Sequence, residues 1–394
     1  MPRKIDDFEA VCEDSASCPC PADEPNPLWV GEKVGSQNAS KARFCWASGF
    51  CNWLFGLLAP ALAQAIEPVK AGSCATSSLD YGNPPEFSEE RHAQRTFLYA
   101  EFFFGSPSVD GLAYVIRPSA DDALTGKFTE PSEQWDPGFC VGFGSHFAHD
   151  SWEFSGDWSF LASKAVQTVH GDSLTPLYID ASSYDQIEAV QQAKEAWDFS
   201  LNALTGRLGR LYFLSQELDI HPEIGILASW IDQSVQISYR NNTATSGLIA
   251  YQTNISNNSF RAGPFLGTHL NWHIRRKFRI FGGGSAALCY RTLQFEQTQI
   301  SVGNTDGDFR IYLTDDSKRL QPYLNCQIGV AWGSFIKKDR NFCEIALQYE
   351  NQYFWREFES RLLYEQVDSS YDRSLNTFGD LSLQSVALRL RLDF

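Results

Sequence analysis

The strongest constraint in this sequence is an alternation of apolar and polar residues that recurs through most of the chain after residue 95. In residues 218–230, one face would carry Leu218, Ile220, Ile224, Ile226 and Trp230. The opposite face would carry Asp219, His221, Glu223 and Ser229. Because successive side chains of a β-strand point to opposite faces, a period of two predicts strands with one apolar face each. The pattern recurs in segments 139–147, 152–160, 197–203, 266–272, 278–291, 324–332, 343–353 and 386–394.

Two architectures satisfy such alternation. A soluble sandwich or barrel turns its apolar faces inward, whereas a membrane barrel turns them outward to lipid. Tryptophans at strand ends favour the membrane, since interfacial girdles lie there. The predicted girdle consists of Trp152, Trp197, Trp230, Trp272, Trp332 and Trp355. We therefore predict an all-β fold, a closed antiparallel transmembrane β-barrel of ten to twelve strands.

The connections between the expected strands are of two lengths. Tight polar breaks fall near 148–151, 215–218, 273–277 and 336–340. Long irregular stretches fall near 118–137, 164–194, 242–257, 297–319 and 356–379. Short turns on one side and long loops on the other are typical of bacterial outer-membrane barrels. We expect the terminal Phe394 to be the signal that the barrel-assembly machinery reads.

The segment 44–66 has the three parts of a secretory signal. Lys41 and Arg43 precede an apolar stretch that is too short to span a bilayer comfortably. Cleavage is predicted after Ala61-Leu62-Ala63, before Gln64. Since a signal should start near the first residue, we expect translation to begin downstream of Met1. The predicted organisation is an irregular leader with a signal-like segment at 1–63, a linker at 64–94 and a barrel at 95–394.

Composition and motifs exclude several function classes. Lys and Arg number 32 against 48 Asp and Glu, and a net charge of -16 argues against a nucleic-acid partner. Cys18-x-Cys20 has no further ligands at zinc spacing, so neither a metal nor a cofactor is expected. His149-Asp150 is a possible acid–base pair, but a turn explains it better, and no G-x-S-x-G motif is present. We do not expect an enzyme.

Charged residues on the polar strand faces are the better functional candidates. Ten of them are predicted to face the lumen: Glu153, Asp157, Asp198, Glu223, Arg279, Arg291, Glu344, Glu350, Arg389 and Arg391. In a wide porin such residues tune ion selectivity. In a barrel of eight to ten strands, side chains nearly fill the interior and the same residues would form a salt-bridged plug. Both interpretations stay open at this stage.

Three segments resemble a known family, the major outer membrane proteins first described in Legionella and abundant in Chlamydia-like bacteria. They are WDPGFCVGFGSHFAHDSWEF (135–154), WDFSLNALTGRLGRLYFLSQELDIHPEIGILASWIDQ (197–233) and GDLSLQSVALRLRLDF (379–394). The spacing of GPFLGTHLNW (263–272) and PYLNCQIGVAWG (322–333) also fits. The resemblance runs from Thr96 to Phe394. It departs from the family pattern in the Cys-bearing leader and at His221, where a basic residue, often Arg, is expected.

The resemblance implies a bacterial outer-membrane location and offers no catalytic motif to carry over. We expect a porin or channel, and alternatively a structural or adhesive surface barrel whose long loops contact the host or the envelope. The expected partners are outer-membrane lipids, the assembly machinery and further copies of the chain in an oligomer.

Overall fold

The computed structural model describes residues 95–119, 122–147, 152–178, 190–215, 217–240, 250–275, 277–302, 309–336, 341–364 and 373–394. The chain divides into two units, Met1–Cys45 and Trp46–Phe394, and all the described residues belong to the second. The predicted leader, the cleavage site at Ala61, Ala63 and Gln64, and the linker lie outside the described residues. Within the described ranges, no helix is both long and apolar enough to cross a membrane.

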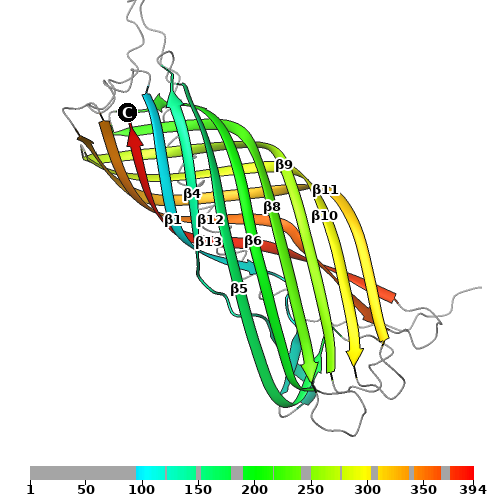
Figure 1. Ribbon diagram of the computed structural model, residues 1–394. Coiled ribbons are helices and arrows are strands. Elements are labelled where there is room, and N and C mark those ends of the chain that lie inside the picture. Colours follow the sequence, from blue (N-terminus) through cyan, green and yellow to red (C-terminus); the bar gives the residue numbers. More distant parts are fainter. Residues whose placement is uncertain are drawn as a thin grey trace, which may run out of the picture. The chain divides into compact units, whose positions relative to one another are not determined.

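The described residues form β-strands that are connected mostly to their neighbours in sequence (Figure 1). They are β1 (Arg95–Val109), β2 (Val115–Ser119), β3 (Asp122–Thr129), β4 (Asp136–His146), β5 (Trp152–Pro176), β6 (Val190–Arg210), β7 (Tyr212–Phe213), β8 (Leu218–Arg240), β9 (Ala250–Arg275), β10 (Phe278–Val302), β11 (Phe309–Ile336), β12 (Asn341–Tyr364) and β13 (Arg373–Asp393).

Ten of these strands close into an antiparallel ring. Around it, β1 is followed by β4, β5, β6 and β8 to β13, counting the described part of the chain alone. The last strand returns to the first in an uninterrupted ladder from Phe97↔Asp393 to Val109↔Leu381. The predicted fold class, a closed antiparallel barrel of ten to twelve strands, is confirmed. The hairpin of β2 and β3 is not one of the ring strands. It pairs with the end of β5 that leads to the long connection.

The strands extend further than the sequence pattern predicted. β8, β9, β10, β11 and β12 contain 23, 26, 25, 28 and 24 residues. A tilted strand needs only about 9–11 residues to cross a bilayer, so more than half of each strand extends beyond the bilayer. The strands β4, β9 and β11 end at His146, Arg275 and Ile336, at the predicted short breaks, but much of the predicted loops 164–194, 242–257, 297–319 and 356–379 is strand. Residues 118–137 also contain β3 rather than a loop throughout.

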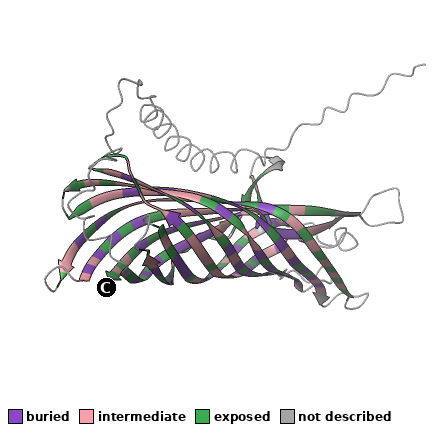
Figure 2. Cartoon of the chain, turned by 90° about the horizontal axis from the view of Figure 1, so that it is seen from above, coloured by how far each residue is buried: buried purple, intermediate pink, exposed green. Residues whose placement is uncertain are grey.

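The two faces of β8 exchange polarity along the strand. From Leu218 to Trp230 the outward face is apolar, and Ile226 is 67% exposed. Beyond Trp230 the same face carries Asp232, Gln236 and Arg240. Figure 2 shows exposed and buried positions alternating along the strands.

The inward face of β8 changes in the opposite sense. Apart from Leu227, it carries polar residues or glycine as far as Ser229. Beyond Ser229, apart from Gln233, it carries Ile231, Val235, Ile237 and Tyr239, all of which are buried. Apolar groups leave water wherever they can, and only lipid makes an outward apolar face stable. The exchange therefore marks where the bilayer ends.

The same exchange divides the whole ring into two parts. We call the part nearer the short turns the membrane zone. It reaches up to Phe104, Phe160, Leu204, Trp230, Phe260, Tyr290, Leu320, Trp355 and Val386. We call the remainder, which leads to the long connections, the extension.

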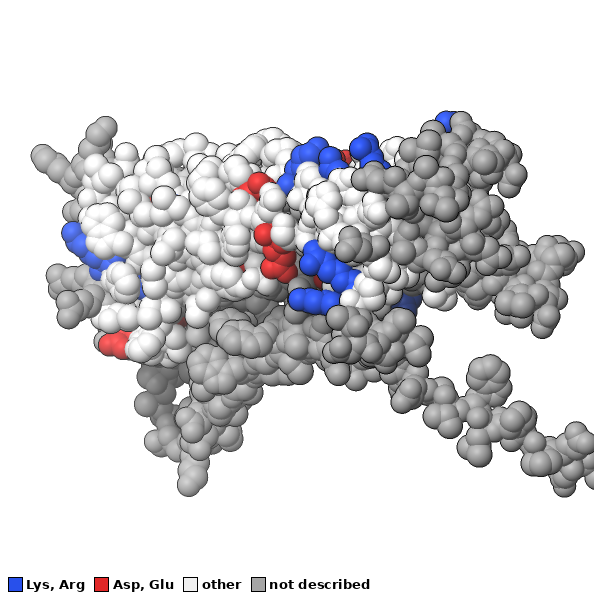
Figure 3. Space-filling model, turned by 90° about the horizontal axis from the view of Figure 1, so that it is seen from below, with Lys and Arg blue, Asp and Glu red and all other residues white. Residues whose placement is uncertain are grey.

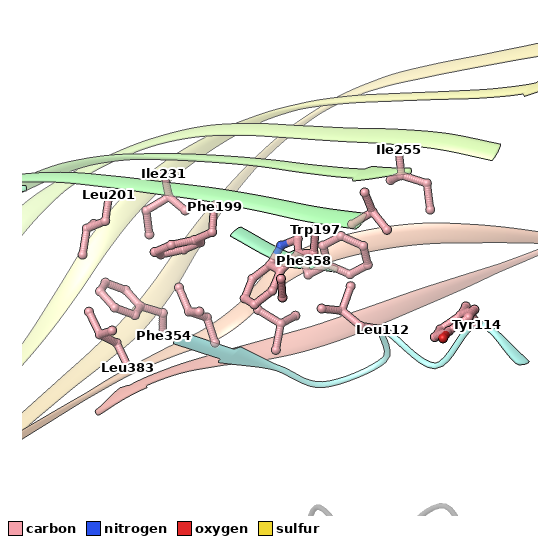
Figure 4. Close-up of a cluster of buried hydrophobic side chains, with 14 of the residues drawn as sticks. Leu112, Tyr114, Trp197, Phe199, Leu201, Ile231, Ile255, Phe354, Phe358 and Leu383 are labelled. Atoms are coloured by element: carbon pink, nitrogen blue, oxygen red, sulfur yellow. The ribbon is translucent and has the colours of Figure 1, made fainter. Parts of the chain in front are cut away.

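The extension is built as two packed sheets. The β11–β12 ladder ends at Tyr323↔Phe354, and the β4–β5 ladder ends at Gly138↔Leu161. Beyond these pairs, the sheet from β5 to β11 faces the hairpin of β12 and β13 and the chain that follows β1. Phe199, Leu201 and Ile231 of the first sheet meet Phe354, Leu383 and Leu112 of the second (Figure 4). Two sheets with their apolar faces together form the core of a β-sandwich.

Candidate functional site in the barrel interior

Charged side chains of adjacent and next-but-one strands pair along the inner wall of the membrane zone. Arg389 on β13 donates from Nε to Glu101 Oε2 on β1 at 2.9 Å. Arg279 on β10 holds Glu344 on β12 with two bonds, 3.0 Å from Nε and 2.6 Å from Nη2. Arg207 Nη2 lies 2.8 Å from Asp157 Oδ2. Such charge-assisted bonds stabilise the partners inside a site that is poorer in water than the surface.

Glycines on β4 make room for two arginines of the lumen, Arg389 and Arg391. An added Cβ at Gly144 or Gly142 would lie 2.2 Å from the ring of Phe97 or Tyr99. Only glycine lets these rings lie flat against the wall. The Arg391 guanidinium then lies over the Phe97 ring at 3.7 Å, and Arg389 lies over Tyr99 at 5.2 Å. Stacking on the aromatic face fixes both cations in the lumen.

Three histidines pair with three further carboxylates in the interior. His146 Nδ1 lies 3.1 Å from Glu153 Oε2, and Arg391 Nη2 donates to His146 Nε2 at 3.0 Å. Because an arginine can only donate, this bond assigns the ring proton of a neutral His146 to Nδ1, on the side of Glu153.

The other two pairs lie on β8 and β9. His269 Nε2 lies 3.1 Å from Glu223 Oε1, and Gln327 Nε2 contacts its Nδ1 at 2.7 Å. His273 Nε2 lies 2.7 Å from Asp219 Oδ2.

These residues surround a cavity that begins near the short turns. Its volume is about 140 Å³, and its lining includes Glu153, Glu223, Arg279, Glu344, Arg389 and Arg391. A second cavity of about 60 Å³ shares Arg207, Glu223, His269, Gln327 and Arg389 with the first. Phe265, Leu227 and Tyr323 also line the second cavity and belong to the apolar core. The polar space is therefore followed, toward the loops, by packed apolar side chains.

A second charged cluster lies within the core of the extension. Arg261 on β9 and Arg291 on β10 are fully buried and contact the carboxylate of Glu357 on β12. Ser259 also donates to this carboxylate. The Arg261 guanidinium lies 4.6 Å above the Phe354 ring. Buried charges are tolerated when they are paired and hydrogen-bonded in this way.

Side-chain amides hold β12 against the inner wall after its ladder with β11 has ended. Asn257 Nδ2 donates to the Glu359 carbonyl at 2.9 Å, and the Glu359 N–H donates to Asn257 Oδ1 at 3.3 Å. Gln297 makes the same two-way contact with Arg361, at 2.8 and 3.0 Å. Each amide replaces a strand neighbour for a backbone that would otherwise be buried without partners.

The structure brings most of the predicted lumenal residues together. Eight of the ten lie in the interior of the membrane zone: Glu153, Asp157, Glu223, Arg279, Glu344, Glu350, Arg389 and Arg391. Of these, Glu350 accepts a bond from Asn325 at 2.7 Å. Arg291 lies deeper, in the buried cluster of the extension. Asp198 is on the outer surface, 2.9 Å from Lys164, with its side chain 44% exposed.

The predicted girdle residues divide in a similar way. Trp152, Trp230, Trp272 and Trp332 are exposed on the outer face, and Trp355 packs on Tyr353 at the upper edge of the membrane zone. Trp197 is only 4% exposed and lies in the core of the extension. Trp197 and Asp198 share one correction: at this height the apolar face of β6 is the inner one, because water has replaced lipid outside. Phe394 ends the chain on the outer face, and its role as an assembly signal stays a prediction.

The sequence prediction missed His146, His269, His273 and Glu101. His146 and His269 lie on the polar faces of predicted strands, so the alternation alone would have placed them in the lumen. His273 falls in the predicted break 273–277, and Glu101 precedes the segments in which the alternation was traced. His149 and Asp150 lie outside the described residues. Among the residues that the structure describes, no group of three His, Cys, Asp or Glu side chains is placed to hold a metal ion.

Residues 96–392 match the model of one family, described as Legionella pneumophila major outer membrane protein precursor. No curated protein matches the chain. Among solved structures, the outer membrane protease OmpT of Escherichia coli is similar at 7% identity and a TM-score of 0.39, over 76% of this chain and 96% of that one. The Pseudomonas putida toluene transporter TodX is similar at 9% identity and a TM-score of 0.27, over 81% and 94%. Likeness of function does not follow from such values.

Proposed function

The chain belongs to the family of the Legionella pneumophila major outer membrane protein, and on that premise we propose that it is a surface barrel that carries its loops away from the bilayer. The protein is an outer-membrane β-barrel in a lipid environment. Within that setting, the proposed role is to present loops to host or envelope components. A general diffusion pore is the less favoured function.

The apolar core of the extension is the observation that carries this proposal. Phe199, Ile231 and Phe354 are almost fully buried where a porin would need a water-filled lumen. Ten strands also enclose little space, since barrels near this size have interiors that side chains can fill. A sandwich of two packed sheets is a stiff support, because its strands cannot bend without disturbing the core.

A narrow ion path is the second candidate function. The polar cavities favour it, since Glu153, Glu223 and Asp219 pair with histidines in the interior. Carboxylates that line a narrow path favour cations. Such a path would have to pass the core of the extension.

Planar-bilayer recordings with the purified full-length protein distinguish these functions. We expect no discrete current steps across a range of salt concentrations and voltages, because the core blocks water. Steps that persist in purified protein, and that change when Glu223 is replaced by Gln, would instead establish the ion path.

Adhesion measurements test the display role. Residues 241–249 or 365–372 are replaced by a Gly-Ser segment of equal length, and binding of the bacteria to host cells is counted. We expect binding to fall for at least one loop. The matched control replaces residues 337–340, which come between β11 and β12 in the sequence, at the ends of these strands opposite to the exchanged loops. If every loop exchange binds as the control does, the loops are not the contact surface.

A further inference from the structure

β12 contains a strained residue at the upper edge of the membrane zone. The β12–β13 register shifts between Phe354 and Phe358, and within this bulge Arg356 has a φ of 48°. In the part of the chain that the structure describes, it is the one residue other than glycine with a positive φ. Side chains with a Cβ rarely adopt this conformation, and such strain is found most often at functional sites.

Hydrogen bonds hold the strained backbone from both sides. The Arg356 N–H donates to Asp380 Oδ1 at 2.7 Å, and its carbonyl accepts from Gln321 Nε2 at 2.9 Å. Tyr353 Oη donates to the other oxygen of Asp380 at 2.6 Å. The carboxylate is thus occupied by two donors, and the Arg356 side chain is left exposed at the surface.

The height of this bulge on the barrel matches the lipid headgroups. Just below it, the rings of Tyr353 and Trp355 pack edge to face at 4.6 Å, as girdle residues do at a membrane interface. On β11, Leu320 is the last apolar residue of the outward face, and Lys318 follows it. Figure 3 shows a broad uncharged surface beside a zone where charged side chains gather.

Two arginines meet at this height, whereas Lys318 points to the opposite face of β11 from Arg319, because successive residues of a strand alternate between its faces. The guanidinium groups of Arg356 and Arg319 both lie over the Phe378 ring, at 5.4 and 4.9 Å. Arg319 faces Glu359 only at 3.9 Å, and neither Arg356 nor Lys318 makes an ion pair within the described residues. Asp316 is the next charge on the outward face of β11, farther from the lipid.

We propose that Arg319, Arg356 and Phe378 form a binding site for a phosphate group of the outer-leaflet glycolipid. The long connections of a bacterial barrel lie outside the cell, so the upper edge of the membrane zone meets the outer leaflet. Guanidinium groups bind phosphate oxygens with paired, charge-assisted bonds, and stacking on Phe378 holds two of them ready. The apolar surface below, from Leu320 to Trp355, receives the acyl chains. This site is independent of the proposed display role.

Binding of lipid A to the delipidated full-length barrel in detergent tests the site. Diphosphorylated lipid A is compared with its dephosphorylated form, by native mass spectrometry and by the rise in melting temperature that a ligand produces. We expect the wild type to prefer the phosphorylated lipid and to lose this preference in high salt. Arg356→Gly and Arg319→Gln should each weaken binding about tenfold, the loss expected for one charge-assisted contact.

Two controls separate binding from folding. Lys194→Gln removes an exposed outward cation from the extension and should bind as the wild type does. Arg356→Gly also relieves the strained φ, so the lipid-free variant should melt no lower than the wild type. Equal affinity of the wild type for both lipids, or unchanged binding by Arg356→Gly and Arg319→Gln, would overturn the proposal.

Discussion

Glu195 shows at the scale of one residue what the change of environment along the barrel does to a side chain. It lies on β6 inside the extension, above the membrane zone, and is fully buried. Neither of its carboxylate oxygens has a hydrogen-bond partner among the described residues, in contrast to Glu357. Burial without a counter-charge, with a smaller effect from Glu130, raises the pKa of Glu195 well above its usual value.

We predict that Glu195→Gln stabilises the protein at neutral pH, by roughly 1–3 kcal/mol, since an unpaired buried charge is removed. A raised pKa in the folded state means that the folded protein binds this proton more tightly than the unfolded chain. Stability from this group is therefore full below about pH 4 and falls as the pH rises above the unfolded pKa. Equilibrium unfolding of the wild type and variant at pH 4 and pH 8 measures the effect. A gain that is equal at both pH values would contradict this origin.

At the scale of the element, the strand β8 shows that one face can contact lipid along one part of its length and water along another. Ile224 and Gln236 are both exposed on its outward face. Ile224 lies near the middle of the apolar stretch, whereas Gln236 lies above Trp230, in the extension. Lipid surrounds the first position and water the second.

The same substitution at both positions should therefore have different costs. Ile224→Lys is predicted to lower the free energy of unfolding by about 2–4 kcal/mol, the cost of a lysine near the bilayer midplane. Gln236→Lys is the matched control, and its effect should stay within about 0.5 kcal/mol, as for other surface substitutions. Urea unfolding of the purified barrel in lipid vesicles gives both values. Equal losses of unfolding free energy for the two variants would mean that the membrane zone has been placed wrongly.

The whole barrel combines a membrane barrel and a sandwich in one continuous sheet. Its membrane zone is stabilised by lipid outside and ion pairs inside, and its extension by an apolar core. Because the strands run through both parts, neither part has a boundary in the sequence. The core of the extension also closes the interior above the polar cavities, and the proposal that the barrel is not a wide pore rests on this closure.

Hydrogen exchange of the whole protein in vesicles tests the two-part description. Amides of 231–239 on β8 and 251–259 on β9 lie outside the bilayer but should exchange as slowly as those of 219–229. Packed sheets protect their backbone bonds as lipid does. Mass spectrometry of peptides after exchange gives this comparison. Rapid exchange throughout the extension would show that its core is loosely packed and would also weaken the case against a pore.

The sequence alone predicted the strands, the ring, the short turns and the outer-membrane family, because each depends on local alternation or on local motifs. It also predicted most of the charged residues that line the lumen, such as Glu223 and Arg389. The strand ends were harder, because the alternation weakens where both faces become mixed in polarity, as in β11 above Leu320.

Alternation determined on its own that each strand has an apolar and a polar face, but it is symmetrical and does not say which face is inside. Trp197 and Asp198 were assigned to the outer face and the lumen on the assumption that one choice holds along the whole strand. The tertiary structure decided otherwise. The ring fixes one inward direction, but the surroundings change from lipid to water along the barrel, and the apolar face must follow that change.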